Sequence, residues 1–178
     1  MPNIPSVDLN NFLSDDQSLK QEFVNKLGKA YQDIGFVALK GHFLKDSDIE
    51  NIYKYIKVFF DLPDEVKCKY ELDGFDGQRG YTSFGKEHAK GKKHGDLKDF
   101  WHFGQYLDDS EYSKLGYPKN LIVDEVQEFN QIGKTVHQSL EKTAMYVLRA
   151  ISLFLDLDED HFDKYVKKGN SILRPIHH

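Results

Sequence analysis

The residues best suited to binding chemistry lie in the middle of the chain, in the runs GQRGYTSFG (77–85) and DLKDFW (96–101). Together these runs carry a guanidinium at Arg79, a phenol at Tyr81, an indole at Trp101 and several acid–base pairs. Glycine permits tight backbone paths, and aromatic and charged side chains can then point into a hollow. The composition of this span predicts an ordered loop and strand at the mouth of a pocket.

The overall composition indicates a mildly acidic protein with one domain, or with one domain and part of a second. Its 178 residues include 24 basic and 29 acidic side chains, a net charge of −5, so we expect no basic face for nucleic acid. Lys90, Lys92 and Lys93 form a local basic cluster that Glu87 and Asp96 interrupt. A solvated loop and a polyanion site are the two interpretations of this cluster, and the mixed charges favour the loop.

Cys68 is the only cysteine, which excludes an intrachain disulfide and indicates a reducing compartment. Residues 1–5 lack the cationic and apolar segments of a signal peptide, and no apolar run has the length of a membrane span. We therefore expect a cytoplasmic protein.

Apolar residues that recur every three or four positions predict several helices around this central span. Gly35 is expected to end the first helix, and Gly133 is a candidate bend in the longest one. The expected elements, in chain order, are a short extended segment at 4–9, helices at 18–34 and from 47, a buried strand at 36–40, a short helix at 63–67, loop and strand at 73–104, a long helix at 121–155, a short helix at 158–167 and a strand from 171.

The last predicted strand has an unusual property: its apolar residues Ile172, Leu173 and Ile176 are followed by only two further residues. An unpaired apolar strand at a sheet edge is a liability that proteins rarely leave uncovered. We therefore expect more polypeptide, or a second subunit, to supply neighbouring strands.

Taken in order, several segments resemble the N-terminal part of the isopenicillin N synthase-like, Fe(II)/2-oxoglutarate-dependent dioxygenases. The resemblance covers essentially the whole chain, and it depends on the order and spacing of motifs that are individually weak. These motifs are IPSVDL at 4–9, YQDIGFV at 31–37, FFDLP at 59–63 with Lys67 after it, GY at 80–81, DLKDF at 96–100 and GNSILR at 169–174.

The resemblance implies an α+β fold, in which a helix-rich N-terminal region at 1–170 leads into a truncated double-stranded β-helix (jelly-roll) barrel that begins at 171–178. It also implies that iron is held by a His-x-Asp pair and a distant histidine, and that an arginine in an Arg-x-Ser motif binds 2-oxoglutarate. In the family these residues lie beyond the equivalent of residue 178. The chain is thus expected to lack the catalytic half, to contain no catalytic or metal-binding residue, to bind neither cofactor tightly and to show no turnover alone.

Two His-x-Asp strings do occur, His94-Gly95-Asp96 and His161-Phe162-Asp163. Chance placement of 8 histidines and 29 acids predicts roughly 1.3 such strings, so two carry little weight. His161 and Asp163 fall on a predicted helix, where positions two apart face different directions. His177 and His178 are adjacent in a strand and point to opposite faces.

The resemblance also suggests residues that contact ligands. Arg79 and Tyr81 resemble positions from which relatives reach the substrate, and an arginine suits a carboxylate; a surface arginine and a packed tyrosine are the alternative. Trp101 is a third substrate-binding candidate, with a place in the core as its alternative. His177 resembles a position that faces the co-substrate, which makes it the candidate cofactor-binding residue.

Three functional hypotheses follow. The first is the N-terminal part of a non-haem Fe(II)/2-oxoglutarate-dependent oxidoreductase that hydroxylates or desaturates a small organic substrate. The second is a non-catalytic interaction or dimerisation module derived from that family, with a homodimer formed through the terminal strand. The third is a metal-binding protein built on His94, Asp96 and His137.

Overall fold

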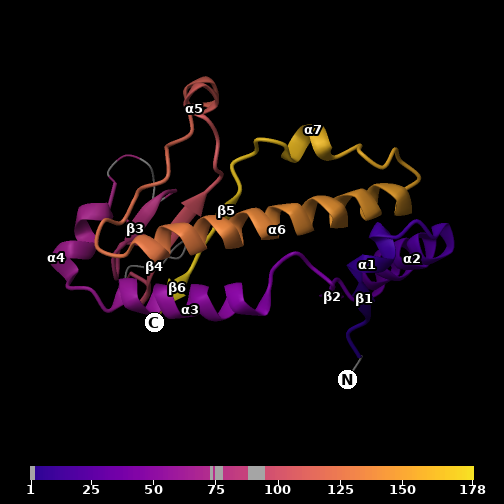
Figure 1. Cartoon of the computed structure of the whole chain (residues 1–178), viewed down its shortest axis with the longest axis horizontal. Helices are drawn as coiled ribbons and strands as arrows, with labels where there is room; N and C mark the ends of the chain where they lie inside the picture. The colour runs from indigo at the N-terminus through magenta and orange to yellow at the C-terminus, as the bar shows by residue number, and fades with distance from the viewer. Residues whose placement is uncertain (1–2, 73, 75–77, 88–94) are drawn as a thin grey trace. The chain divides into compact units, whose positions relative to one another are not determined.

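The computed structural model describes residues 3–72, 74, 78–87 and 95–178. The described chain forms two compact units: the first comprises Met1–Lys45 and Ser139–Lys167, and the second Asp46–Gln138 and Lys168–His178. The long helix α6 (Gln127–Phe154) contributes to both units and is the orange helix in Figure 1. Among the described residues, no helix combines the length and the apolar character that crossing a membrane requires.

The first unit packs helices against a two-stranded parallel sheet. Strand β1 (Ser6–Asp8) pairs with β2 (Ala38–Lys40), and Val7 lies opposite Leu39. Helices α1 (Leu9–Leu13) and α2 (Gln17–Asp33) follow β1, and α7 (Asp163–Val166) follows the end of α6. The buried core of this unit consists of Val7, Leu9, Phe12, Phe23, Val24, Leu27 and Ala150.

Local side-chain chemistry sets the ends of α2 close to the predicted range 18–34. The Asp16 carboxylate accepts hydrogen bonds from the backbone N–H groups of Ser18 and Leu19, at 2.8 and 3.3 Å. Gly35 has a φ of +81°, a conformation that glycine adopts without steric cost, and follows the last turn as expected.

Three sequence-based predictions about elements were wrong in detail. The strand expected at 36–40 begins at Ala38 and is largely exposed rather than buried, with Phe36 68% exposed. The helix expected at 158–167 is confined to Asp163–Val166, so His161 lies in the preceding turns. The long helix begins at Gln127 rather than at residue 121.

The side chain of Asn130 explains the late start of α6. Its amide accepts from the N–H of Val123 at 2.9 Å and donates to the carbonyl of Val123 at 2.8 Å. This pair of bonds occupies the backbone groups that would otherwise extend the helix towards the N-terminus. Val123 is fully buried, so the segment before α6 is part of the core although it is not helical.

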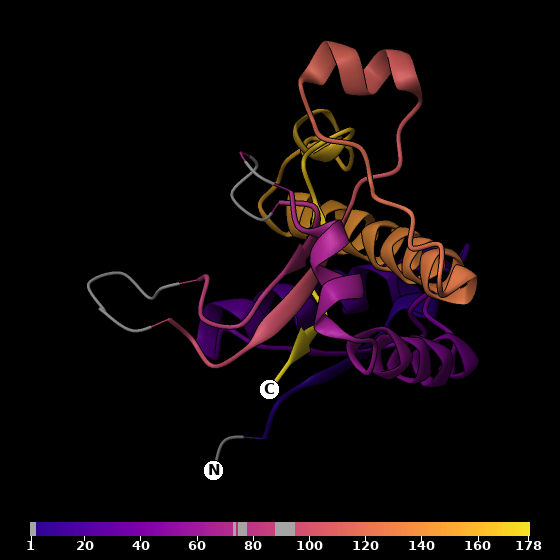
Figure 2. The ribbon, with the colours of Figure 1, turned by 90° about the vertical axis from the view of Figure 1, so that its left-hand side faces the viewer.

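The second unit is organised around the central strand β4 (Asp99–Gly104). Strand β3 (Gly80–Thr82) pairs with one side of β4, and β5 (Ile172–Leu173) and β6 (Ile176–His177) pair with the other, all antiparallel. Figure 2 shows the yellow terminal strand beside β4. The helices are α3 (Asp46–Phe60), α4 (Asp64–Lys67) with the 3₁₀ turn η1 (Cys68–Tyr70) after it, α5 (Asp109–Leu115) and the first part of α6.

Strands β5 and β6 form one edge strand in a single register. Leu173 lies opposite Phe103, and His177 lies opposite Asp99, so no residue is inserted between the two pairings. Pro175 has no N–H to donate, but its carbonyl accepts from the N–H of Trp101 at 3.1 Å. The proline therefore interrupts the ladder without shifting it.

One face of β4 carries the aromatic core of this unit. Asp99, Trp101 and Phe103 alternate onto that face, as the two-residue period of a strand requires. The Phe59 and Phe129 rings stack at 4.8 Å, and the Trp101 ring lies edge-on to Phe59 at 4.9 Å. Tyr81, Trp101 and Phe103 are each at most 3% exposed.

A close contact at Gly28 generates a test of packing in the first unit. A Cβ at this position would lie 2.1 Å from the Phe154 ring, so Gly28→Ala forces the ring to move. Overpacking of this kind costs about 1–3 kcal/mol, against a gain of about 1 kcal/mol in helix propensity. We expect Gly28→Ala to lower the free energy of unfolding by about 1 kcal/mol, measured by urea denaturation with circular dichroism at 222 nm.

Two further variants control this prediction. Lys29→Ala changes an exposed neighbour on the same helix and should alter the stability by less than about 0.5 kcal/mol. Phe154→Leu should reduce the penalty of Gly28→Ala, because it removes the ring that the new methyl group meets. Equal penalties in both backgrounds would contradict the contact.

Candidate functional site around Asp99 and His177

The site is centred on the buried carboxylate of Asp99, the first residue of β4, which is 0% exposed. Tyr81 Oη donates to its Oδ2 at 2.8 Å, and Nδ1 of His177 lies 2.9 Å from its Oδ1. Lys67 Nζ lies 3.6 Å from Oδ2. A buried carboxylate is strongly unfavourable unless donors and a cation compensate it, and these three groups do so.

The sheet register places two of these partners. His177 lies directly opposite Asp99 across the ladder, and Tyr81 lies opposite Trp101, on the same face and diagonal to Asp99. The third partner, Lys67, is the last residue of α4 and is itself buried. Its ammonium also contacts the Phe60 carbonyl at 3.2 Å.

Burial dominates the electrostatics of Tyr81. Burial away from water raises the pKa of the Tyr81 hydroxyl well above its usual value. The hydrogen bond that this hydroxyl donates to the Asp99 carboxylate raises the pKa further. The phenol is therefore a neutral donor at physiological pH. The Lys67 ammonium lies 5.6 Å from the centre of the same ring, over its face.

His177 is the part of the cluster that solvent can reach. Its side chain is 47% exposed, whereas that of Asp99 is fully buried. The imidazole stacks on the Phe60 ring at 5.0 Å with an interplanar angle of 11°, and Phe84 approaches edge-on at 6.4 Å. The ring is thus held by a hydrogen bond at Nδ1 and by an aromatic surface on one face.

Arg79 lies apart from this cluster, fully buried in the same unit. Its guanidinium donates to the Gln78 carbonyl at 2.7 Å and to Oδ1 of Asn170 at 2.8 Å. It packs directly on Gly104, where a Cβ would lie 1.8 Å from the guanidinium carbon. Burial lowers the pKa of Arg79. In this position the side chain ties the loop before β3 to the segment that leads into β5.

Of the four ligand-binding residues that the sequence suggested, the structure joins Tyr81 and His177 through Asp99. Trp101 is 1% exposed and packs within the aromatic core. Sequence reasoning did not select Asp99 or Lys67 as site residues. A signal existed for Asp99, because it shares a strand face with two large apolar residues, where an acid requires partners.

The opposite face of β4 carries a second polar group. Arg174 Nε donates to Nε2 of His102 at 2.5 Å, and its guanidinium lies 4.3 Å from the centre of the Phe100 ring. Glu87 lies 3.4 Å from Arg174. The hydrogen bond from Lys98 to Glu87, together with the charge of Arg174, lowers the pKa of the Glu87 carboxyl.

The described residues do not fit an iron centre. No group of three or more histidine, cysteine, aspartate or glutamate side chains that could hold a metal occurs among them. His94 lies outside the described residues, Asp96 pairs with Lys98 at 3.0 Å, and Asp163 pairs with Arg149 at 2.6 Å. His137 is buried beside Tyr106, with its Nε2 3.4 Å from the Ser171 carbonyl.

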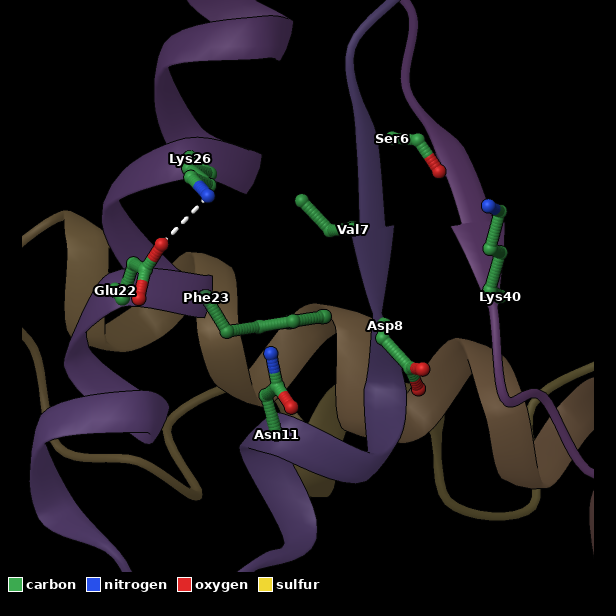
Figure 3. A pocket seen from close by; sticks show the side chains of 8 residues that line it. All are labelled: Ser6, Val7, Asp8, Asn11, Glu22, Phe23, Lys26 and Lys40. Carbon is green, nitrogen blue, oxygen red and sulfur yellow. Dashed lines mark ion pairs between the residues drawn. The ribbon is translucent and has the colours of Figure 1, made fainter.

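A hollow of about 310 Å³ lies in the first unit between α2 and β1 (Figure 3). It is lined by Ser6, Val7, Asp8, Asn11, Glu22, Phe23, Lys26 and Lys40. Its polar groups largely serve local structure: Lys26 pairs with Glu22 at 2.5 Å, and the Asp8 carboxylate accepts from the N–H of Asn10 at the start of α1. We therefore place the candidate functional site at Asp99 and His177.

Comparison with known proteins shows the family. Residues 4–125 match the family model described as non-haem dioxygenase in morphine synthesis, N-terminal. A 2OG-Fe(II) oxygenase family protein from Caulobacter crescentus is 32% identical, with a TM-score of 0.85 over 100% of this chain and 57% of that protein. Leucoanthocyanidin dioxygenase of Malus domestica is 31% identical over 93% of this chain and 44% of its own length. The 1-aminocyclopropane-1-carboxylate oxidase of Dictyostelium mucoroides is 26% identical over 98% and 48%.

The chain therefore belongs to the non-haem dioxygenase N-terminal family, and its homologues are 2-oxoglutarate/Fe(II) dioxygenases. This confirms the family that the sequence motifs indicated, and the α+β fold expected from it. The chain spans about half the length of the curated relatives that it matches.

The hydrogen bond from Tyr81 to Asp99 gives a test of the site's internal support. Tyr81→Phe removes the hydroxyl and leaves a buried carboxylate oxygen short of a donor. Hydrogen bonds to charged groups contribute about 1.5–3 kcal/mol, so we expect a loss of about 2 kcal/mol in the free energy of unfolding. Guanidinium denaturation followed by circular dichroism measures it.

Tyr53→Phe is the matched control. Tyr53 is 71% exposed on α3, so loss of its hydroxyl should change the stability by less than about 0.5 kcal/mol. Similar small losses in both variants would show that the hydroxyl of Tyr81 does not stabilise Asp99.

Proposed function

We propose that this chain forms the N-terminal part of a non-haem Fe(II)/2-oxoglutarate-dependent oxidoreductase that hydroxylates or desaturates a small organic substrate. The observation that carries the proposal is the similarity, over the whole chain, to a 2OG-Fe(II) oxygenase family protein at 32% identity and a TM-score of 0.85. Relatives named for leucoanthocyanidin and for 1-aminocyclopropane-1-carboxylate support a small-molecule substrate. We propose neither nucleic acid nor a membrane as a binding partner.

We assign iron and 2-oxoglutarate to a part of the full-length enzyme that lies outside this chain. The described residues bring together no set of three or more side chains that could ligate a metal. The coverage of about half of each relative supports this division. Residues 1–170 would then form the N-terminal region, and 171–178 would form the first strand of the barrel.

The chain's own contribution is to build and support one wall of the site. We propose that His177, whose ring is half-exposed, faces the co-substrate side and contacts a bound ligand. Arg79, Tyr81 and Trp101 are buried, which favours supporting roles for them over direct contact with substrate. Arg79 holds the segment before β5, and Tyr81 holds Asp99.

The proposal predicts that the purified 178-residue chain shows no turnover. Oxygen consumption and succinate formation should not rise above background when Fe(II), 2-oxoglutarate and ascorbate are supplied. A complete 2-oxoglutarate dioxygenase, assayed in parallel with its own substrate, confirms that the assay works. Oxygen uptake that requires both iron and 2-oxoglutarate would overturn the assignment of the cofactors to another part of the enzyme.

A specific observation keeps the interaction module as the second candidate. Ile172 and Ile176, on the terminal edge strand, are 38% and 46% exposed. Pairing of this edge with a second copy of the chain would cover them. The chain would then act as a dimerisation module without catalysis.

This candidate predicts a dimer that depends on concentration and dissociates in Ile172→Lys, measured by sedimentation velocity over a hundredfold range of concentration. A charge on the edge strand opposes pairing between strands. Ser47→Lys adds the same charge at an exposed position on α3 and should leave the dimer intact. A monomer across the whole range would exclude the candidate.

For localisation, we propose a reducing compartment such as the cytoplasm. The support is the single cysteine, Cys68, which is exposed and has no possible intrachain partner.

A further inference from the structure

We infer that Asp99 is a positioning residue that fixes the proton of His177 on Nδ1 and so presents Nε2 as a hydrogen-bond acceptor for a donor group, such as a hydroxyl, of a bound small molecule. The ligand part of this inference rests on the proposed function, in which His177 contacts a ligand. The tautomer part rests only on the geometry of the cluster.

The contact itself sets the direction of the hydrogen bond. Nδ1 of His177 lies 2.9 Å from Oδ1 of Asp99. An ionised carboxylate can only accept, so Nδ1 carries the hydrogen. In a neutral imidazole the other nitrogen, Nε2, is then left with a lone pair and acts as an acceptor.

Oδ2, the other oxygen of Asp99, also acts as an acceptor. Tyr81 Oη donates to Oδ2 at 2.8 Å, and the Lys67 ammonium lies 3.6 Å from it. Burial keeps the Tyr81 hydroxyl protonated, and an ammonium has no acceptor. Both partners of Oδ2 are therefore donors, and Oδ2 is an acceptor towards each of them.

The orientation of the ring is fixed as well as its tautomer. The hydrogen bond at Nδ1 and the stacking of the ring on Phe60 at 5.0 Å hold it from two directions, while 47% of the side chain remains exposed. An ordered acceptor on an exposed ring selects ligand groups that carry a hydrogen, such as a hydroxyl or an amine. A carboxylate, including either carboxylate of 2-oxoglutarate, is disfavoured there because it would face the lone pair of Nε2. The ligand that His177 contacts is therefore the organic substrate rather than the co-substrate.

Replacement of Asp99 by asparagine should move the proton of the His177 ring from Nδ1 to Nε2. The single amide oxygen of Asn should occupy the Oδ2 position, because Tyr81 and Lys67 both present donors there. The amide NH₂ group then faces His177 and donates to Nδ1. This forces the proton of the ring onto Nε2 and converts Nε2 from an acceptor into a donor.

The test is long-range ¹H–¹⁵N correlation NMR of the imidazoles in the ¹⁵N-labelled 178-residue chain, at a pH where the rings are neutral. His177→Gln identifies the signals of His177 among the 8 histidines, because only those signals should disappear. We expect the Nδ1–H tautomer in the wild type and the Nε2–H tautomer in Asp99→Asn. Tyr81→Phe keeps the carboxylate of Asp99 and should leave the Nδ1–H tautomer unchanged.

A wild-type spectrum that shows the Nε2–H tautomer would overturn the inference without any variant. The inference can therefore be tested even if Asp99→Asn does not fold. Retention of the Nδ1–H tautomer in a folded Asp99→Asn would overturn the positioning role. A merely structural role for Asp99 would change stability but not the site of the proton.

Modification with diethylpyrocarbonate, read by peptide mass spectrometry, tests the exposed acceptor directly. The lone pair of an unprotonated imidazole nitrogen attacks a carbonyl carbon of this reagent, which forms an N-ethoxycarbonyl histidine and releases ethyl carbonate, itself breaking down to carbon dioxide and ethanol. Wild-type His177 should react at Nε2. In Asp99→Asn the lone pair of the His177 ring would be on Nδ1 and would face the protein interior, so most of that reactivity should be lost. Absence of reaction in the wild type would overturn the exposed acceptor. Neither experiment uses iron or 2-oxoglutarate, so failure of the proposed enzymatic function would leave both results interpretable.

Discussion

The second unit depends on one electrostatic constraint, the burial of a carboxylate at the start of its central strand. Asp99 shares a face with Trp101 and Phe103, and water does not reach it. The compensating groups come from three separate places in the sequence: Lys67 at the end of a short helix, Tyr81 on one neighbouring strand and His177 on the other. A one-residue slip of either neighbouring strand would turn its polar group to the wrong face. The charge therefore helps to specify the register of the sheet as well as the contents of the site.

The helices of the chain were accessible to sequence reasoning because their signals are local. The apolar period, the cap at Asp16 and Gly35 lie within a few residues of the ends of α2. The sequence-based prediction placed the start of α6 too early. The side chain of Asn130 forms hydrogen bonds to the backbone of Val123, seven residues earlier, and the spacing of apolar residues gives no indication of such a contact. The apolar period alone favours the longer helix, and the hydrogen bonds of a single side chain override it.

Only part of the candidate site could be predicted from the sequence, because its key contacts join residues that are distant along the chain. Tyr81 and His177 were selected by resemblance to family motifs, but their meeting at Asp99 depends on strand pairings that join residues far apart in the sequence. Arg79 illustrates the converse. Resemblance to relatives suggested that it contacts the substrate, and a surface position was the alternative; in the structure the side chain is buried between Gly104 and Asn170. A guanidinium at the mouth of a pocket and one inside a wall cannot be distinguished by composition.

The position of Trp101 has a practical consequence for following this protein in solution. It is the only tryptophan in the chain, and it lies 1% exposed in the aromatic core of the second unit. Its fluorescence emission depends on the polarity around the indole, so the signal reports the integrity of that unit alone. The first unit contains no tryptophan and gives no tryptophan fluorescence, whereas far-ultraviolet circular dichroism records the helices of both units. Coincidence or separation of the two unfolding curves therefore reveals whether the units melt together.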